Sequence, residues 1–277
     1  MSNALVVLQG QSTQLTEIEQ MILEEMATDP NAFDFKPERV KIAPGGIGQW
    51  LVGEEPTKSF TAIVAISQKV RGYWPGTELG KPPLCSSPDG VRGVFARNPD
   101  PDHIQKATKA ADPHPAIRLY DAGKPVPDTF GCASCPLNQF GSAHQKDGQT
   151  EGKACSESRR LLVLIDGMAY PAVVSLPVMS IKNWDGYCSG LATRKSSYFA
   201  VRTKFELDSD MSNGGQKYNK ASVSAVGALS KEEITAVLEV RRQFRELVSE
   251  MPIVSDEYET TDAPAPVDDY ADETPPF

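Results

Sequence analysis

Four cysteines in one stretch of the sequence have the type and spacing of a metal site. Cys132 and Cys135 form a CxxC motif, and Pro136 follows it directly. Two thiolates at this spacing bind one metal from a tight turn, and tetrahedral zinc takes two further ligands, commonly Cys or His. Cys85 and Cys155 supply the two remaining thiolates. We therefore predict one structural zinc ion that is held by these four cysteines.

Other interpretations of these cysteines remain open. His144 is the main rival ligand, and His103 and His114 are weaker ones. An iron–sulfur cluster fits the same spacing. A redox-active CxxC requires a βαβ context that the pattern lacks, and unrelated reduced thiols are the simplest alternative. Cys188 is left out of the set because it lies on the apolar face of a predicted helix, where a buried free thiol is ordinary.

Cations and tyrosines alternate along the outward faces of two predicted strands. This combination suits unpaired nucleic acid, because phosphates take the positive charge and bases stack on aromatic rings. Lysine and arginine also solvate ordinary outer strand faces, and tyrosine is an ordinary β former. The recurrence of the same chemistry on two strands favours nucleic-acid binding. The predicted contacts are Lys69, Arg71, Tyr73, Arg194, Lys195, Tyr198, Arg202, Lys204, Lys217 and Tyr218.

The acidic residues are concentrated at the two ends of the chain. The net charge is −9, from 28 Lys and Arg against 37 Asp and Glu. Residues 251–277 carry eight acids and no base, which leaves −1 for residues 1–250. The segment 16–34 holds six more acids and no base, so the remainder has a net charge of about +5. The overall acidity therefore does not exclude a nucleic-acid partner for the body of the protein.

The apolar periodicity predicts a mainly β (α+β) fold. About six strands, short helices and one long insertion favour an OB-like small β-barrel with an inserted zinc-binding module and flanking helices. A capping box at Ser230 and Glu233 begins a last helix, which Pro252 ends. The expected parts are an acidic helical segment at 1–34, a barrel body at 35–250 with the insertion at about 75–158, and a disordered acidic tail at 251–277. Strands are predicted at 49–52, 61–74, 161–165, 170–174, 197–207 and 221–228, and a helix at 180–191.

The tail carries a specific resemblance. Asp268 and Asp269 are followed by Asp272-Glu273-Thr274-Pro275-Pro276-Phe277. This ending resembles the C-terminal tip of bacterial and phage single-stranded DNA-binding proteins, which end in an acidic run and Pro-Phe or a bare Phe. The layout is also similar to the helix-destabilising proteins of T-even phages, with a barrel, a zinc module and an acidic tail. The zinc motif differs from theirs in spacing, and Cys stands where a His would be among the ligands.

The resemblance implies a function and a role for the tail. Pro276 and Phe277 would dock on a partner, with Asp272 and Glu273 facing its basic rim. The body would bind single-stranded DNA without strong sequence preference and protect it during replication, recombination and repair. The tail would recruit replication and recombination proteins, and the protein would not be an enzyme.

Two alternatives belong to other functional classes. A nuclease or primase-like enzyme would need clustered carboxylates for two metals, and the body has no such cluster at a recognisable spacing. A zinc-stabilised adaptor would bind protein alone. The sequence shows no signal peptide and no apolar run of the length of a membrane span. We therefore expect a cytoplasmic protein, in a bacterial host if phage-encoded, with no membrane partner.

Overall fold

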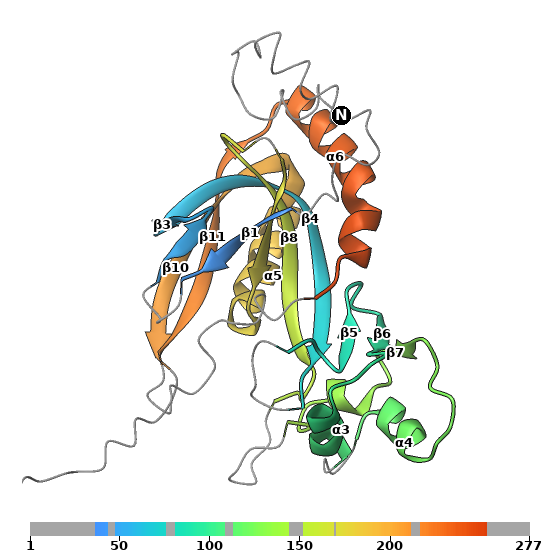
Figure 1. Cartoon of the computed structure of the whole chain (residues 1–277). Helices are drawn as coiled ribbons and strands as arrows, with labels where there is room; N and C mark the ends of the chain where they lie inside the picture. Colours follow the sequence, from blue (N-terminus) through green and yellow to red (C-terminus); the bar gives the residue numbers. More distant parts are fainter. Residues whose placement is uncertain are drawn as a thin grey trace, which may run out of the picture.

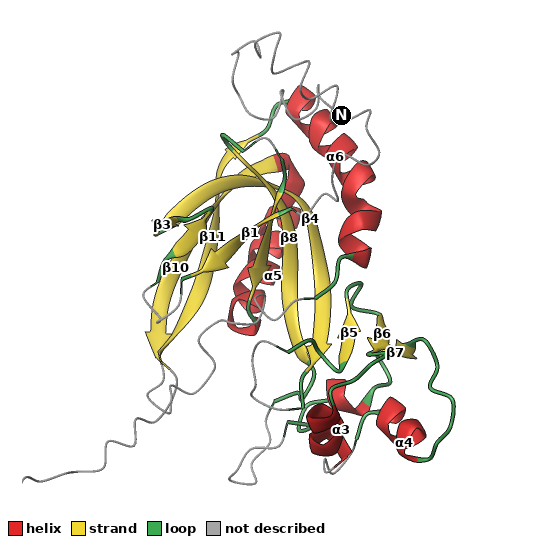
Figure 2. Cartoon of the chain, viewed as in Figure 1, coloured by secondary structure: helices red, strands yellow, loops and turns green. Residues whose placement is uncertain are grey.

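A computed structural model describes residues 37–43, 48–75, 81–108, 113–143, 152–168, 170–211 and 217–253 of the chain. The predicted helical segment at 1–34 and the tail from residue 254 lie outside these described residues. The described chain has a mixed α/β fold that is built on one large sheet (Figures 1 and 2).

The sheet has 11 strands in the described part of the chain, and it is not closed. Its main path runs β3-β2-β1-β9-β8-β4-β5-β6-β7, while β10 pairs with β4 and β11 pairs with β10. The pair β1–β9 is parallel. The strands are β1 (Glu38–Ile42), β2 (Trp50–Val52), β3 (Glu55–Thr57), β4 (Ser59–Tyr73), β5 (Cys85–Ser87), β6 (Arg92–Phe95), β7 (Phe130–Gly131), β8 (Ser156–Ile165), β9 (Ala172–Leu176), β10 (Val201–Met211) and β11 (Lys217–Ala228). The mainly β character is confirmed, but the closure that an OB-like barrel requires is not.

The long strand β4 is the spine of the sheet. It pairs with β8 along most of its length, with β10 at its start and with β5 at its end. The predicted strand at 61–74 is thus confirmed, but its two faces are not one buried and one exposed. Ile63 and Ala65 are as buried as Ala62 and Val64, because the sheet is covered on both sides.

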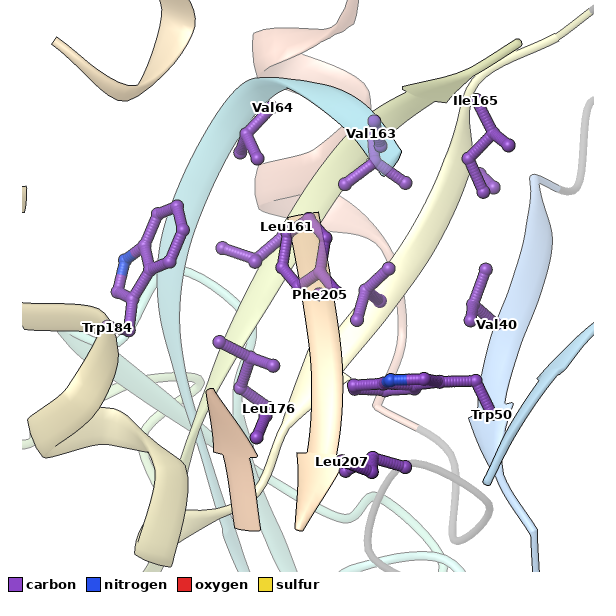
Figure 3. Close-up of a cluster of buried hydrophobic side chains, with 14 residues drawn as sticks. Val40, Trp50, Val64, Leu161, Val163, Ile165, Leu176, Trp184, Phe205 and Leu207 are labelled. Carbon is purple, nitrogen blue, oxygen red and sulfur yellow. The ribbon is translucent and has the colours of Figure 1, made fainter. Parts of the chain in front are cut away.

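Two helices provide this cover. Helix α5 (Val178–Thr193) and helix α6 (Lys231–Glu250) pack on opposite faces of the sheet (Figure 1). Trp184 of α5 joins the core around Trp50 and Phe205 (Figure 3). The capping box at Ser230 and Glu233 is confirmed, with each side chain bonded to the other residue's backbone. The shorter elements are α3 (Pro101–Thr108), α4 (Pro115–Asp121) and the 3-10 turns η1 (Pro136–Asn138) and η2 (Tyr198–Ala200).

A buried arginine fixes the point at which the tail begins. The guanidinium of Arg160 donates hydrogen bonds to the carbonyls of Val248, Met251 and Pro252. Met251 and Ile253 are themselves buried. Residues 251–253, which the sequence pattern assigns to the disordered tail, therefore belong to the folded body.

The predicted insertion has a hydrophobic cluster of its own. We call residues 81–155 the cysteine module. It contains β5, β6, β7, α3 and α4 and lies beyond the end of β4 (Figure 1). Leu84, Phe95, Ile117 and Leu137 form the centre of its cluster, with Tyr73 from the end of β4. Because this cluster is small, its apolar burial stabilises the module only weakly, and a bound metal would add to that stability.

Candidate functional site

The four predicted cysteine ligands line one small cavity in the cysteine module. Cys85 begins β5, Cys132 and Cys135 lie in the turn after β7, and Cys155 directly precedes β8. The cavity has a volume of about 20 Å³, which is room for a single water molecule or ion. All four side chains are free thiols.

Strand pairing and one turn bring these cysteines together. Strand β6 pairs with β5 on one side and with β7 on the other. The N–H of Cys135 donates to the carbonyl of Cys132 at 3.4 Å, which closes the CxxC turn, and Pro136 begins η1. The N–H of Cys155 donates to the carbonyl of Leu137 at 2.9 Å. These backbone hydrogen bonds bring together residues that are far apart in sequence.

A glycine keeps the space between two of the sulfurs open. A Cβ atom added to Gly93 would lie 2.9 Å from the Sγ of Cys85 and 3.7 Å from the Sγ of Cys132. The first distance is shorter than carbon–sulfur packing permits. Any other residue at this position would force the Cys85 side chain or the strand beside it to shift.

Burial makes two of these thiols, Cys155 and Cys85, poor acids while no cation is bound. It raises the pKa of Cys155 to about 12, and the neighbouring Cys135 and Cys132 add to the effect. Burial also raises the pKa of Cys85. A coordinated divalent cation reverses this, because it deprotonates its thiol ligands. Within the described residues, no group of three His, Cys, Asp or Glu side chains has the geometry to hold a metal ion. The four thiols therefore line one cavity without being arranged as a coordination site.

The histidines are weaker candidates for a ligand. His114 lines the same cavity, but its Nδ1 accepts a hydrogen bond from the N–H of Ala116 at 3.1 Å. In this neutral tautomer Nε2 carries the proton and is not free to bind a metal, and burial lowers the pKa of His114 to about 4. His103 is buried in α3 and is not among the residues lining the cavity. His144 lies outside the described residues.

Tyr73, predicted as an exposed base-stacking residue, is instead buried. Only 5% of its surface is exposed, and it lines the cysteine cavity. Burial raises its pKa to about 12, with further contributions from Cys135 and Cys155. The exposed-face prediction is wrong here because the cysteine module folds against this end of β4.

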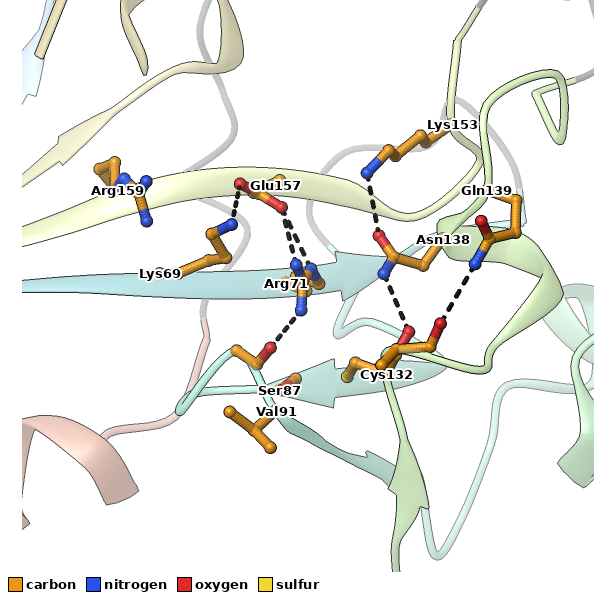
Figure 4. A network of polar contacts seen from close by, with 12 residues as sticks. Lys69, Arg71, Ser87, Val91, Cys132, Asn138, Gln139, Lys153, Glu157 and Arg159 are labelled. Carbon is orange, nitrogen blue, oxygen red and sulfur yellow. Dashed lines mark hydrogen bonds and ion pairs between the residues drawn. The ribbon is translucent and has the colours of Figure 1, made fainter. Parts of the chain in front are cut away.

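The cations Lys69 and Arg71 share one carboxylate. Glu157 on the neighbouring strand β8 lies 3.0 Å from Lys69 Nζ and 3.0 Å from an Nη atom of Arg71 (Figure 4). Partial burial alone would raise the pKa of Glu157, but the hydrogen bond from Lys69 and the charges of both cations lower it further than burial raises it. One carboxylate therefore offsets half of the positive charge of these two cations.

The cations of β10 are paired in the same way. Arg202 lies 3.0 Å from Asp166 and 3.1 Å from Glu233. Lys204 lies 2.7 Å from Glu206. A phosphate would have to displace these acids before it could bind either cation.

The remaining predicted aromatic residues have structural contacts. Tyr198 is half-buried against Trp184, with a ring centroid distance of 5.6 Å. Arg241 of α6 lies over the Tyr198 ring at 5.5 Å. The hydroxyl of Tyr218 donates to Asp210 at 3.0 Å. The side chain of Lys217 lies outside the described residues.

Two predicted cations, Arg194 and Lys195, stand apart from the others. Both are exposed, and within the described part of the chain neither has an acidic partner in an ion pair. They follow α5, and Arg194 lines an open groove of about 610 Å³ between α5 and β11, which we call the α5–β11 groove; Lys195 lies between two lining residues in sequence but does not line the groove itself. Its lining includes Tyr187, Leu191, Arg194, Val201, Val223 and Ser224.

Lys195 has an unusual backbone conformation. Its φ is 57°, and it is the one non-glycine residue with positive φ among the described residues. Its N–H donates to the carbonyl of Ala192, and the N–H of Ser196 donates to the carbonyl of Leu191, each at 2.9 Å. These two bonds define a Schellman motif, in which glycine is the usual residue at this position. A lysine here carries strain that the fold itself does not need.

Sequence reasoning missed the α5–β11 groove. A signal for it was present in residues 221–228 (ASVSAVGA), which contain no charge and no proline. Such a stretch leaves an edge strand unprotected, and β11 is an edge strand that pairs with β10 alone among the described strands. The groove forms only because α5 packs beside β11, and the hydrophobic periodicity does not show where α5 packs.

Comparisons with known proteins do not indicate a function, so the proposed function rests on the geometry of the site. No protein-family model, curated protein or solved structure matches this chain. None of the helices in the described ranges has the length and apolar character of a bilayer span. The predicted tail contacts Asp272, Glu273, Pro276 and Phe277 lie outside the described residues.

Proposed function

We propose that this protein binds single-stranded DNA and that the α5–β11 groove holds part of the strand. The observation that carries this proposal is the contrast between the predicted cations. Lys69, Arg71 and Arg202 are bound to carboxylates, whereas Arg194 and Lys195 are exposed and Arg194 lines the groove. A cation without an acid partner can bind a phosphate directly.

The lining of the groove suits unpaired bases. Leu191, Val201 and Val223 supply apolar surface, and Tyr187 supplies an aromatic ring. The Tyr187 hydroxyl is hydrogen-bonded to Thr203 at 2.7 Å, which fixes the ring. The volume of the groove falls within the range of ligand sites, about 300–1,000 Å³. Apolar and aromatic contacts accept any base, which accords with binding that lacks strong sequence preference.

We also propose one structural zinc ion in the cysteine cavity. Cys85, Cys132, Cys135 and Cys155 would hold it, and a closed set of four thiolates supports folding rather than catalysis. The cavity size and the glycine between two sulfurs fit such an ion. Zinc would offset half of the negative charge of the four buried thiolates and fasten the CxxC turn to β5 and to the start of β8.

The tail completes the proposal. Its acidic run and terminal Phe277 would recruit replication and recombination proteins, in the cytoplasm of a bacterial host. When DNA is absent, the acids of the tail would occupy Arg194 and Lys195. This competition links the two oppositely charged parts of the chain.

A titration with fluorescently labelled oligo-dT at several salt concentrations tests the proposed function. For single strands the salt slope changes by about 0.7 for each phosphate contact, so the double variant Arg194→Ala/Lys195→Ala should lose about 1.4 from the slope. Lys58→Ala removes another exposed cation that neither lines the groove nor adjoins a lining residue in sequence, and its slope should match the wild type. Absence of single-strand binding at low salt, or an unchanged slope in the double variant, would refute the assignment.

A protein-binding adaptor is the second candidate, because the β11 edge can accept an added strand. Edge strands bind extended peptides through main-chain hydrogen bonds, and residues 224–228 of β11 are exposed. Such an adaptor would bind peptide and fail to bind oligo-dT in the same titration. The enzyme alternative gains no support from Asp166 or Asp185, because Asp166 is bound to Arg202 and Asp185 to Arg159.

A further inference from the structure

The cysteine module presents a phenylalanine ring to solvent. Phe140 follows η1, and 80% of its surface is exposed, more than for any other large apolar side chain among the described residues. It lies a few residues beyond the CxxC turn. An apolar ring in this position contributes little to the core of the module, so its placement calls for another explanation.

The loop that carries this ring is held in place. The N–H of Gly141 donates to the carbonyl of Gly152 at 2.9 Å. The Ser142 hydroxyl accepts a hydrogen bond from the N–H of Ala154 at 2.9 Å. These bonds fasten the loop to the segment that leads into β8, so Phe140 is exposed from a fixed position and little ordering would accompany binding.

A cation stands over one face of the ring. Lys153 Nζ lies 4.8 Å from the centroid of Phe140. The same Nζ donates to the Asn138 side-chain oxygen at 3.4 Å, and the Asn138 amide donates to the carbonyl of Cys132 at 2.9 Å (Figure 4). The lysine is thus positioned from the CxxC turn. With most of the ring exposed, its other face remains open.

We propose that Phe140 and Lys153 form a binding site for an unpaired nucleobase and its phosphate. The base stacks on the open face of Phe140, and the Lys153 ammonium neutralises the adjoining phosphate. This inference rests on the proposed single-strand binding and gives the cysteine module a direct part in it. A strand that leaves the α5–β11 groove then has a second point of attachment on the module.

Two substitutions separate stacking from simple apolar contact. Phe140→Leu keeps an apolar side chain but removes the aromatic face, and it should weaken oligo-dT binding by about 5- to 150-fold, the range for loss of one stacked base. Phe140→Trp keeps an aromatic face and should bind as the wild type does. Tyr120→Leu removes a half-exposed ring elsewhere on the module and should leave affinity unchanged.

The tryptophan variant also reports stacking directly. Trp50 and Trp184 are buried and Trp74 is half-buried, so the quenching of the new exposed indole is measured as the difference between Phe140→Trp and the wild type. Oligo-dT should quench it, while an abasic oligonucleotide of the same length should not. Oligo-U in a parallel titration shows whether RNA is bound at the same site.

The outcomes distinguish this inference from the proposed function. If wild type binds oligo-dT and Phe140→Leu binds equally well, the stacking site is wrong and the single-strand function stands. Equal quenching by abasic and normal oligonucleotides would also refute stacking. If wild type does not bind single strands at low salt, the proposed function fails, and this inference fails with it.

Discussion

Replacing Lys195 by glycine should make the protein more stable and a weaker DNA binder. The residue occupies the left-handed position of a Schellman motif, with φ of 57° and both diagnostic hydrogen bonds present. Glycine is the residue that this position favours. If lysine occupies this position for its charge, the substitution should raise stability and lower DNA affinity at the same time.

The magnitude follows from two opposing terms. A non-glycine residue in the left-handed region costs about 1–2 kcal/mol, which Lys195→Gly would recover. The greater freedom of glycine in the unfolded chain offsets about 0.4–1 kcal/mol of this. The net gain in unfolding free energy is therefore about 0.5–1 kcal/mol. For a folded body of this size, that corresponds to a rise in Tm of about 1–4 °C.

Two assays on three proteins check this prediction. Thermal unfolding gives the stability of the wild type, Lys195→Gly and Lys195→Ala, and the oligo-dT titration gives their salt slopes. Lys195→Ala removes the charge and keeps a side chain in the strained position, so its Tm should stay near the wild type. Both variants should lose about 0.7 from the single-strand salt slope.

Each readout can fail on its own. A lower Tm for Lys195→Gly than for the wild type would refute the strain argument. A higher Tm with an unchanged salt slope would confirm the strain and refute the phosphate contact. Equal stability of the glycine and alanine variants would show that the Schellman geometry does not decide the stability at this position.

Three further predictions concern the metal, the tail and pH. We expect one zinc ion per chain by metal analysis, lost in Gly93→Ala and retained in Cys188→Ser, because only the first change closes the cavity. A chain ending at Ile253 should bind oligo-dT more tightly than the full chain at low salt, and unchanged affinity would contradict tail competition. Removing residues 251–253 as well should cost at least about 3 kcal/mol of unfolding free energy, because it deletes buried apolar groups. Partial burial acts to raise the pKa of Asp89, but hydrogen bonds from two backbone N–H groups and from Arg92 lower that pKa to about 2. This stabilisation is present above the usual carboxyl pKa and is lost as pH falls towards 2, so the stability difference between wild type and Asp89→Asn should shrink in acid unfolding below about pH 4.

Local patterns in the sequence predicted the local parts of the fold. The capping box at Ser230 marked the start of α6, and the apolar spacing around Trp184 marked α5. The shared chemistry of four cysteines predicted that they lie together, and they do line one cavity. The two helix predictions depended on residues close together in the chain. The cysteine prediction depended on the need of one metal for four ligands, which does not require that they be close in sequence.

The solvent faces could not be predicted in the same way. Glu157, which neutralises Arg71, lies 86 residues away in sequence and reaches it only through the β4–β8 pairing. Glu233 reaches Arg202 from the first turn of α6. Alternation identifies which residues share a face, but the acids that will be brought to that face depend on topology. The same holds for Tyr73, which a separately folded module covers.

The pairing of strand-face cations with carboxylates changes the salt dependence of DNA binding that the charge pattern predicts. A basic body of about +5 would by itself predict many phosphate contacts and a steep salt dependence. With several strand-face cations held by carboxylates, the sheet offers fewer cations to phosphates, and the two sites proposed above contribute three, Arg194, Lys195 and Lys153. Three contacts correspond to a slope of only about −2 for a single strand. Most of the affinity must then come from bases stacked at the groove and on Phe140, so binding should persist at salt concentrations that release a purely electrostatic binder. A slope much steeper than this would show that DNA displaces the carboxylates from the sheet and binds the paired cations after all.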